Sequence, residues 1–148
     1  MTTTNTFRQA ETEIRDLLEQ RAAATRAKDP DGATALFAND VVTFDVVNPM
    51  QRVGVESVRP RTQEWFSGFR GAIGYEMRDV NVSASDDVAF AHLLYRVSGT
   101  LASGDELGMW NRATFCFRKI DGAWRIVHEH DSVPFDPATG MASTDLEP

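Results

Sequence analysis

The chain has 148 residues, 42% of them apolar, which is the size and composition of one globular domain with its own hydrophobic core. Its 15 basic and 22 acidic residues give a formal charge of −7, which argues against a nucleic-acid partner, and no apolar run is long enough to span a membrane. Because there is one cysteine and no secretory leader, we expect no internal disulfide, no cysteine metal cluster and a cytoplasmic location.

The first part of the chain is predicted to be helical. Apolar side chains recur every three or four residues from Phe7 to about Lys28, which is the spacing of one buried helix face. A second, shorter helix is expected after Asp29, which suits an N-cap and precedes a proline, and Phe37 would lie on its buried side. Residues 1–6 are polar and are expected to form a disordered N-terminal tail.

The middle of the chain is predicted to add a strand and a third helix. Residues 41–47 are rich in β-branched and aromatic side chains and favour a strand, while residues 48–54 are expected to form a loop. Residues 55–69 indicate a helix, because Trp65 and Phe69 would share an apolar face.

The second half of the chain is predicted to be a meander of antiparallel strands. These strands are expected at residues 73–85, 88–101, 107–120 and 123–133. Asp121 and Gly122 separate the last two and are a strong hairpin signal. Helices followed by consecutive strands predict an α+β fold, with three N-terminal helices packed in a strongly curved mixed or antiparallel sheet. The domain is expected to span residues 7–135, and residues 136–148 to form a C-terminal tail.

Two of the three histidines lie one residue apart in the last predicted strand. With a two-residue turn at 121–122, Phe115 would lie opposite His128 and Ala113 opposite His130, and both imidazoles would face the helices. Histidine exchanges protons near neutral pH, so both are candidate catalytic groups. The alternative is a structural role in the sheet core.

The same register has consequences for the rest of the last strand. Ser132 would share the inner face with the imidazoles and lie towards the open end of the sheet. Glu129 and Asp131 would lie on the outer face, where Arg112 would pair with Asp131. Together with Arg96, these charges would give the outer face a polar, complementary character suited to a two-fold interface.

The order of elements and three segments resemble the nuclear transport factor 2-like superfamily, in particular its SnoaL-like and ketosteroid isomerase-like proteins. The segments are LFANDVVTFD, the R-x-G at residues 52–54, and DGAWRIVHEHDSVPF. The resemblance covers residues 7–135. It implies a cone-shaped α+β barrel, in which a curved sheet wraps the helices around a deep apolar pocket, and a homodimer formed through the outer face of the sheet.

The resemblance also implies roles for individual residues. Aligned without gaps, Asp45 takes the place of the general base of ketosteroid isomerases, although it could instead cap the end of its strand. Arg21 falls where those enzymes have an oxyanion-hole tyrosine, and Thr114 lies near the place of a protonated aspartate. Because two hydroxylic donors are then lacking, true steroid isomerisation is not expected. Arg21 could reach the pocket, pair with Asp45 or extend into solvent.

The ligand-binding candidates are mostly aromatic, and several of them could instead be simple core residues. They are Arg21, Phe44, Trp65, Phe69, Trp110, Phe115 and Ser132, with Tyr75 as a further aromatic candidate.

These residues lead to an expected function with alternatives. The resemblance implies a SnoaL-like pocket protein, and Asp45 with His130 and His128 would suit acid–base chemistry, without a cofactor, on a small apolar carbonyl or hydroxyl compound. Isomerase, cyclase, dehydratase and hydrolase reactions all fit. The alternative is a non-catalytic ligand-binding or dimeric association module. A zinc site built from the two histidines and Asp45 is a weaker reading, and no metal is expected.

Overall fold

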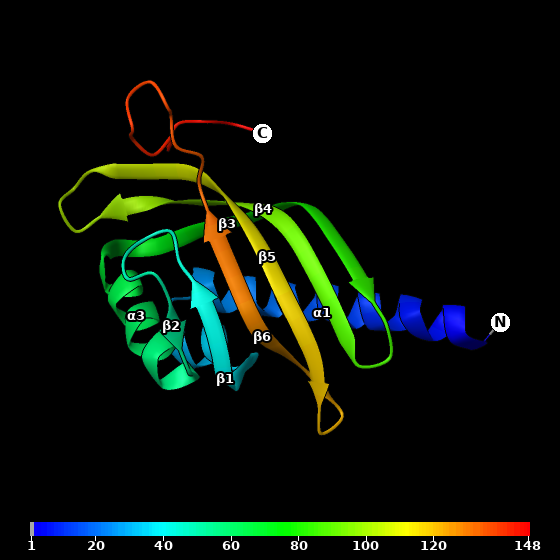
Figure 1. The fold of residues 1–148 in the computed structure, drawn as a ribbon. Coiled ribbons are helices and arrows are strands. Elements are labelled where there is room, and N and C mark those ends of the chain that lie inside the picture. Colours follow the sequence, from blue (N-terminus) through cyan, green and yellow to red (C-terminus); the bar gives the residue numbers. More distant parts are fainter. Residues whose placement is uncertain (1) are drawn as a thin grey trace.

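The computed structural model describes residues 2–148 and shows helices lying along the inner side of one curved sheet (Figure 1). The helices are α1 (Thr2–Arg26), α2 (Pro30–Thr34) and α3 (Val55–Ser67). The strands are β1 (Phe37–Phe44), β2 (Arg52–Val53), β3 (Phe69–Ala84), β4 (Val88–Leu101), β5 (Glu106–Ile120) and β6 (Ala123–Ser132). Their order in the sheet is β2-β1-β6-β5-β4-β3, and β1 and β6 are parallel whereas all other neighbours are antiparallel. The predicted α+β class with a curved mixed sheet is confirmed.

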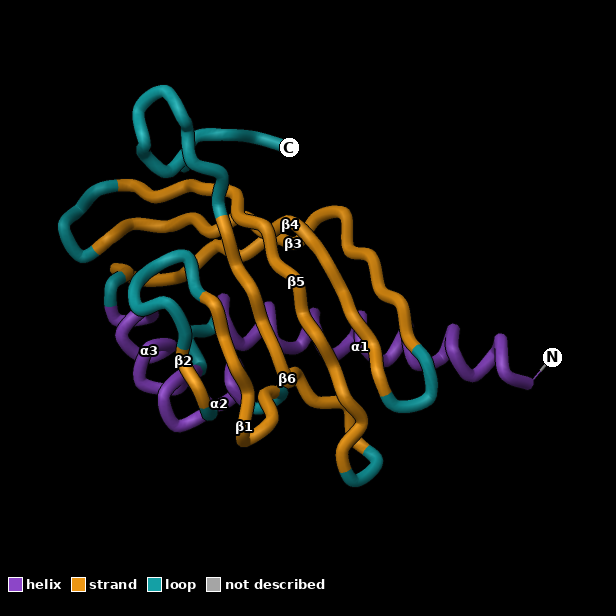
Figure 2. Tube along the Cα trace, viewed as in Figure 1, coloured by secondary structure: helices purple, strands orange, loops and turns teal. Residues whose placement is uncertain are grey.

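Helix α1 crosses the inner side of the sheet and continues beyond its edge (Figure 2). Ile14, Leu18 and Ala22 recur at intervals of four and are almost completely buried, so they form the stripe that holds the helix on the sheet. The helix begins at Thr2, so the predicted disordered tail 1–6 is helical wherever it is described. Met1 lies outside the described residues.

The segment after α1 folds differently from the prediction at three points. The Asp29 side chain accepts a hydrogen bond from the Gly32 N–H and caps α2 as predicted, but α2 ends before Phe37, which opens β1. The expected loop at 48–54 contains β2, which pairs with β1. Phe69 begins β3 instead of ending α3, because the helix stops at a glycine. At Phe37 and Phe69 a buried aromatic residue suits either element, and local pattern does not decide between them.

A β-bulge in β6 determines which of its side chains face the helices. The hairpin pairs Ile120 with Ala123, as predicted, and this register continues to Phe117 and Ile126. The next pair is Cys116 with His128, so Val127 has no partner across the strands. Such an extra residue reverses the alternation of all side chains beyond it.

The bulge makes the predicted register wrong for the second half of β6. Phe115 lies opposite Glu129 instead of His128, and Ala113 lies opposite Asp131 instead of His130. Glu129 is therefore buried on the inner side of the sheet, whereas His130 is exposed.

The C-terminal segment forms a small turn above the end of β6 (Figure 1). Phe135 pairs with Ala142 in an isolated bridge, and the amides of Thr139 and Gly140 donate to the Asp136 carbonyl. Residues 136–148 are mostly exposed and do not line the cavity described below. Among residues 2–148, no helix combines the length and apolar character needed to cross a membrane.

Candidate functional site

A cavity with a volume of about 140 Å³ opens inside the cone, between α1, α3 and the sheet. That space is enough for several waters or a small organic molecule. Part of its lining is apolar and consists of Val58, Trp65, Phe66, Val97, Leu107 and Met109. The lining also includes three arginines, three carboxylic acids and two tyrosines, which are Arg21, Arg52, Arg61, Asp45, Glu129, Asp131, Tyr75 and Tyr95.

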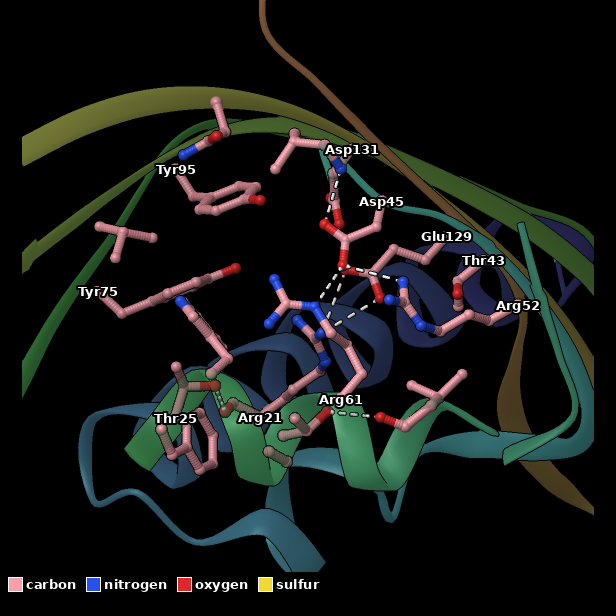
Figure 3. Close-up of a pocket in the computed structure, with 18 of the residues that line it drawn as sticks. Arg21, Thr25, Thr43, Asp45, Arg52, Arg61, Tyr75, Tyr95, Glu129 and Asp131 are labelled. Atoms are coloured by element: carbon pink, nitrogen blue, oxygen red, sulfur yellow. Dashed lines mark hydrogen bonds and ion pairs between the residues drawn. The ribbon is translucent and has the colours of Figure 1, made fainter. Parts of the chain in front are cut away.

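The inner face of β6 supplies Glu129 and Asp131 to this cavity (Figure 3). Arg21, from α1, donates from one terminal nitrogen to both Glu129 oxygens, at 3.1 and 3.2 Å. The guanidinium carbon of Arg21 also lies over two aromatic rings, 5.3 Å from the centroid of Phe115 and 5.4 Å from the centroid of Phe37. Burial lowers the pKa of Arg21, but Glu129 and, less strongly, Tyr75, Asp131 and Tyr95 together more than offset this, so the guanidinium stays charged.

Of the three acids of the cavity, Asp131 has the fewest partners that stabilise its negative charge. Its Oδ1 atom is buried, and no described residue forms a hydrogen bond with it. Burial raises the pKa of Asp131 well above that of an ordinary aspartate, and the neighbouring charges of Glu129 and Asp45 raise it further while Arg21 opposes them. Two carboxyl groups this close favour sharing one proton.

Asp45 lies in the cavity, as predicted, but its partners differ from those expected. Its Oδ1 accepts a hydrogen bond from the Val46 N–H at 2.7 Å, so it does cap the end of β1. Its Oδ2 accepts from Arg61 Nε at 3.2 Å and from a terminal nitrogen of Arg52 at 3.4 Å. Arg21 pairs with Glu129 instead of Asp45.

Two stacked tyrosines complete the polar side of the cavity. The rings of Tyr75 on β3 and Tyr95 on β4 are 5.1 Å apart and nearly parallel, and both hydroxyls point towards the charged groups (Figure 3). Burial raises the pKa of both phenols, so they remain protonated and can donate hydrogen bonds. Hydroxylic donors are therefore present, and the reason given above for excluding steroid isomerisation does not hold.

The two histidines of β6 lie on the other side of the sheet from the cavity. His128 contacts the Val42 carbonyl through Nδ1 at 2.7 Å, and its ring packs edge-on against Phe44. His130 is exposed and also packs against Phe44. The expectation that both imidazoles face inward is wrong, because the bulge at Val127 turns them outward.

The other predicted ligand-binding residues divide among three places. Arg21, Trp65 and Tyr75 line the cavity. Phe69 and Phe115 are buried in the core, Phe115 completely. Phe44, Trp110 and Ser132 lie on the outer face, where Ser132 accepts a hydrogen bond from Arg112 Nε, so the predicted pairing of Arg112 with Asp131 is also wrong.

The site contains five ionisable residues that the sequence did not indicate. Glu129 and Asp131 were assigned to the outer face, and no residue type marks the bulge that turns them inward. Arg52 and Arg61 come from β2 and α3 and meet Asp45 only through the fold. Tyr95 is the one residue of the five with a local signal, because it alternates with the apolar residues that β4 buries.

The arrangement gives no support to a zinc site. Asp45 lies in the cavity whereas His130 lies outside, so the three proposed ligands do not converge. Within residues 2–148, no cluster of three or more histidine, cysteine, aspartate or glutamate side chains has a geometry that could hold a metal ion.

The fold and cavity define the class as an α+β cone that encloses a small-molecule-sized hollow. The model of the SnoaL-like domain family matches residues 14–136, and the chain belongs to this family. No curated protein matches the chain.

Several solved structures share the fold. An NTF2-like protein of unknown function from Pseudomonas putida KT2440 is 34% identical, with a TM-score of 0.87, over 95% of this chain and 97% of that one. A ketosteroid isomerase-like protein from Erwinia carotovora atroseptica SCRI1043 is 22% identical, with a TM-score of 0.73, over 85% and 97%. The association domain of CaMKII from C. elegans is 19% identical, with a TM-score of 0.69, over 87% and 99%. The last two likenesses describe the fold alone.

Proposed function

We propose that the protein is an acid–base enzyme that moves a proton on a small organic molecule bound in the cavity, with Asp131 as the group that transfers it. The observation that carries this proposal is that Asp131 lines the cavity while its Oδ1 atom is buried without a hydrogen-bond partner among the described residues. A buried carboxyl group with a free oxygen is costly to maintain for stability alone and is typical of functional sites.

The surrounding residues suit this chemistry. The raised pKa of Asp131 brings its two protonation states closer to neutral pH, which favours general acid–base catalysis. Ionised Asp131 would take a proton from the carbon next to a carbonyl, and the C–H electron pair would form the enolate. Tyr75 or Tyr95 would donate a hydrogen bond to the enolate oxygen, and Asp131 would return its proton to the same carbon or, where a conjugated double bond extends the enolate to a dienolate, to the far carbon of that system. Arg21 would hold Glu129 in place beside Asp131.

Asp45 has a lesser place in this proposal than the sequence suggested. Both of its oxygens already accept hydrogen bonds, from Val46, Arg52 and Arg61, which leaves the carboxylate less available to a bound molecule. The same observation favours the second candidate function, a non-catalytic protein that binds a small molecule in the cavity.

Deuterium exchange tests the enzymatic proposal without knowledge of the product. A panel of ketones, keto acids and hydroxy acids is incubated with the protein in D₂O, and the loss of α-proton signals is followed by proton NMR. We expect catalysed exchange with at least one compound, reduced about 100- to 10,000-fold by Asp131→Asn. The matched control is His130→Ala, which should exchange at the wild-type rate. Exchange that is equal in Asp131→Asn, or absent throughout the panel, would leave the binding function as the better account.

We also propose that two copies of the chain pair through the outer face of the sheet. This face carries Phe44, Phe90, Leu94 and Trp110, and Phe90 is 48% exposed. Its charges are not those expected, because the acids of β6 point inward, but Glu76 and Arg96 lie opposite each other on β3 and β4. The oligomerisation implied by the name of the CaMKII association domain is consistent with such a use of the fold.

A further inference from the structure

The cavity holds more hydrogen-bond donors than its own acceptors satisfy. Arg61 uses only Nε, in its bond to Asp45, and its two terminal nitrogens have no hydrogen-bond partner among the described residues. Arg21 Nε is buried and also lacks a described partner. Since an arginine offers five N–H donors, and the two tyrosine hydroxyls add theirs, the cavity is short of acceptors.

The bonds that Asp45 receives from the two arginines are weak for their type. Arg61 and Arg52 both donate to the same oxygen, Oδ2, at 3.2 and 3.4 Å. Strong bonds between a guanidinium and a carboxylate are about 2.7–2.9 Å long. The two arginines are therefore positioned around a carboxylate without being saturated by it, and a second acceptor can bind to the N–H groups that remain.

The charge of the cavity points in the same direction. Arg21, Arg52 and Arg61 contribute three positive charges, and they face Asp45, Glu129 and Asp131. When Asp131 holds its proton, which its raised pKa favours, two negative charges oppose the three positive ones. One positive charge is then uncompensated inside a protein whose formal charge is −7. One ligand carboxylate would neutralise it, whereas a phosphate dianion would overcompensate.

We infer that the ligand of this cavity is a monocarboxylate with an apolar body. Its carboxylate contacts the free N–H groups of Arg61, beside Asp45, and its body lies against the wall formed by Trp65, Leu107 and Met109. This inference deepens the proposed function and rests on the same cavity, but it concerns which molecule binds and not whether it reacts. It adds a negative charge to the ligand, which was expected to be a small apolar carbonyl or hydroxyl compound.

Pairs of acids and amides of the same shape test this inference. Calorimetric titrations use cyclohexanecarboxylate with cyclohexanecarboxamide, 4-phenylbutyrate with 4-phenylbutyramide, and inorganic phosphate. We expect at least one acid to bind about 10-fold or more tightly than its amide, which corresponds to about 1.4 kcal/mol. Phosphate should bind more weakly than that acid. Equal binding of acid and amide, tighter binding of phosphate, or no binding of either acid at millimolar concentration would overturn the inference.

Variants of Arg61, on α3, test where the ligand carboxylate binds. Arg61→Gln should reduce acid affinity about 10-fold and leave amide affinity unchanged, and Arg61→Lys should give an intermediate loss, because it keeps the charge without the planar fork. The control is Arg59→Gln on the same helix, since Arg59 pairs with Asp31 away from the cavity. Unchanged acid affinity in Arg61→Gln would contradict the placement, and if Arg61 variants do not fold, the acid–amide comparison on the wild type decides.

The two proposals fail separately. Exchange that depends on Asp131 without an acid preference would overturn only the ligand class. An acid preference without exchange in D₂O would overturn only the enzymatic function.

Discussion

The position of His130 shows that the role of a single side chain depends on which face of the sheet it lies on. His130 was one of the three catalytic candidates of the sequence, with Asp45 and His128, yet it is exposed on the outer face. We expect His130→Ala to leave ligand binding unchanged and to alter the free energy of unfolding by no more than about 0.5 kcal/mol. Calorimetric titration and urea denaturation measure both. A loss of binding would mean that His130 reaches the cavity after all.

His128 has a structural contact that His130 lacks. Its ring nitrogen bonds to the Val42 carbonyl and links β6 to β1. His128→Ala should therefore lower the free energy of unfolding by about 1 kcal/mol, without an effect on ligand affinity. Urea denaturation of His128→Ala beside His130→Ala checks this, and equal stability of the two variants would contradict it.

Asp131 makes stability depend on pH in a direction unusual for an aspartate. Its pKa is raised in the folded protein, so between the ordinary and the raised value the folded state binds more protons than the unfolded chain. The free energy of unfolding then falls as the pH rises through this window. In Asp131→Asn the fall should be smaller, and above the window this variant should be more stable than the wild type. Urea midpoints measured from about pH 4 to pH 9 test this; a wild type that instead gains stability relative to Asp131→Asn over this range would contradict it.

An ion pair between Arg21 and Glu129 links two elements of the fold, α1 and β6. Arg21 and Glu129 are far apart in sequence and form a largely buried ion pair inside the cone. Arg21→Met should lower the free energy of unfolding by about 3–5 kcal/mol, because Glu129 then keeps a buried charge without its partner. The double variant Arg21→Met with Glu129→Leu should recover most of this loss. Denaturant unfolding of the single and double variants measures the coupling, and additive losses would show that the pair does not act as a unit.

Much of each element could be predicted from sequence, and the errors have physical causes. The buried stripe of α1, the cap at Asp29 and the alternation in β4 are local signals, and they gave the right elements. Phe37 and Phe69 suit the buried side of either a helix or a strand, so the boundaries of α2 and α3 were wrong. The bulge at Val127 depends on how β6 pairs with both of its neighbours, and neither pairing is encoded in the residues of β6 alone.

At the scale of the whole molecule, the cavity could be predicted from the sequence better than the ionisable residues that line it. The cone, its inner face and the positions of Asp45 and Arg21 follow from local pattern and family resemblance. The ionisable network does not, because Arg52, Arg61, Glu129 and Asp131 come from separate elements that meet only in the folded cone. Because of the bulge at Val127, two carboxylic acids of β6 face the cavity where two imidazoles were expected.

The outer face gives a prediction for the assembled molecule. If two copies pair through it, a charge placed among its apolar side chains will separate them. We expect a dimer for the wild type and a monomer for Phe90→Asp in sedimentation at micromolar concentration. Met141→Asp is the control, because Met141 is also an exposed apolar residue but lies in the C-terminal turn. A wild-type monomer, or a dimer that persists in Phe90→Asp, would contradict pairing through this face.

The central claim is that Asp131, beside Glu129, is the proton-transferring group of the cavity. Carbon-13 NMR of the aspartate carboxyl groups across a pH titration tests it most directly, with the Asp131 signal assigned by its loss in Asp131→Asn. We predict that this carboxyl group keeps its proton to a pH well above that of an ordinary aspartate, and that Glu129→Gln lowers the pH at which the proton is released. An Asp131 signal that titrates like a solvent-exposed aspartate, and is unchanged in Glu129→Gln, would contradict the claim.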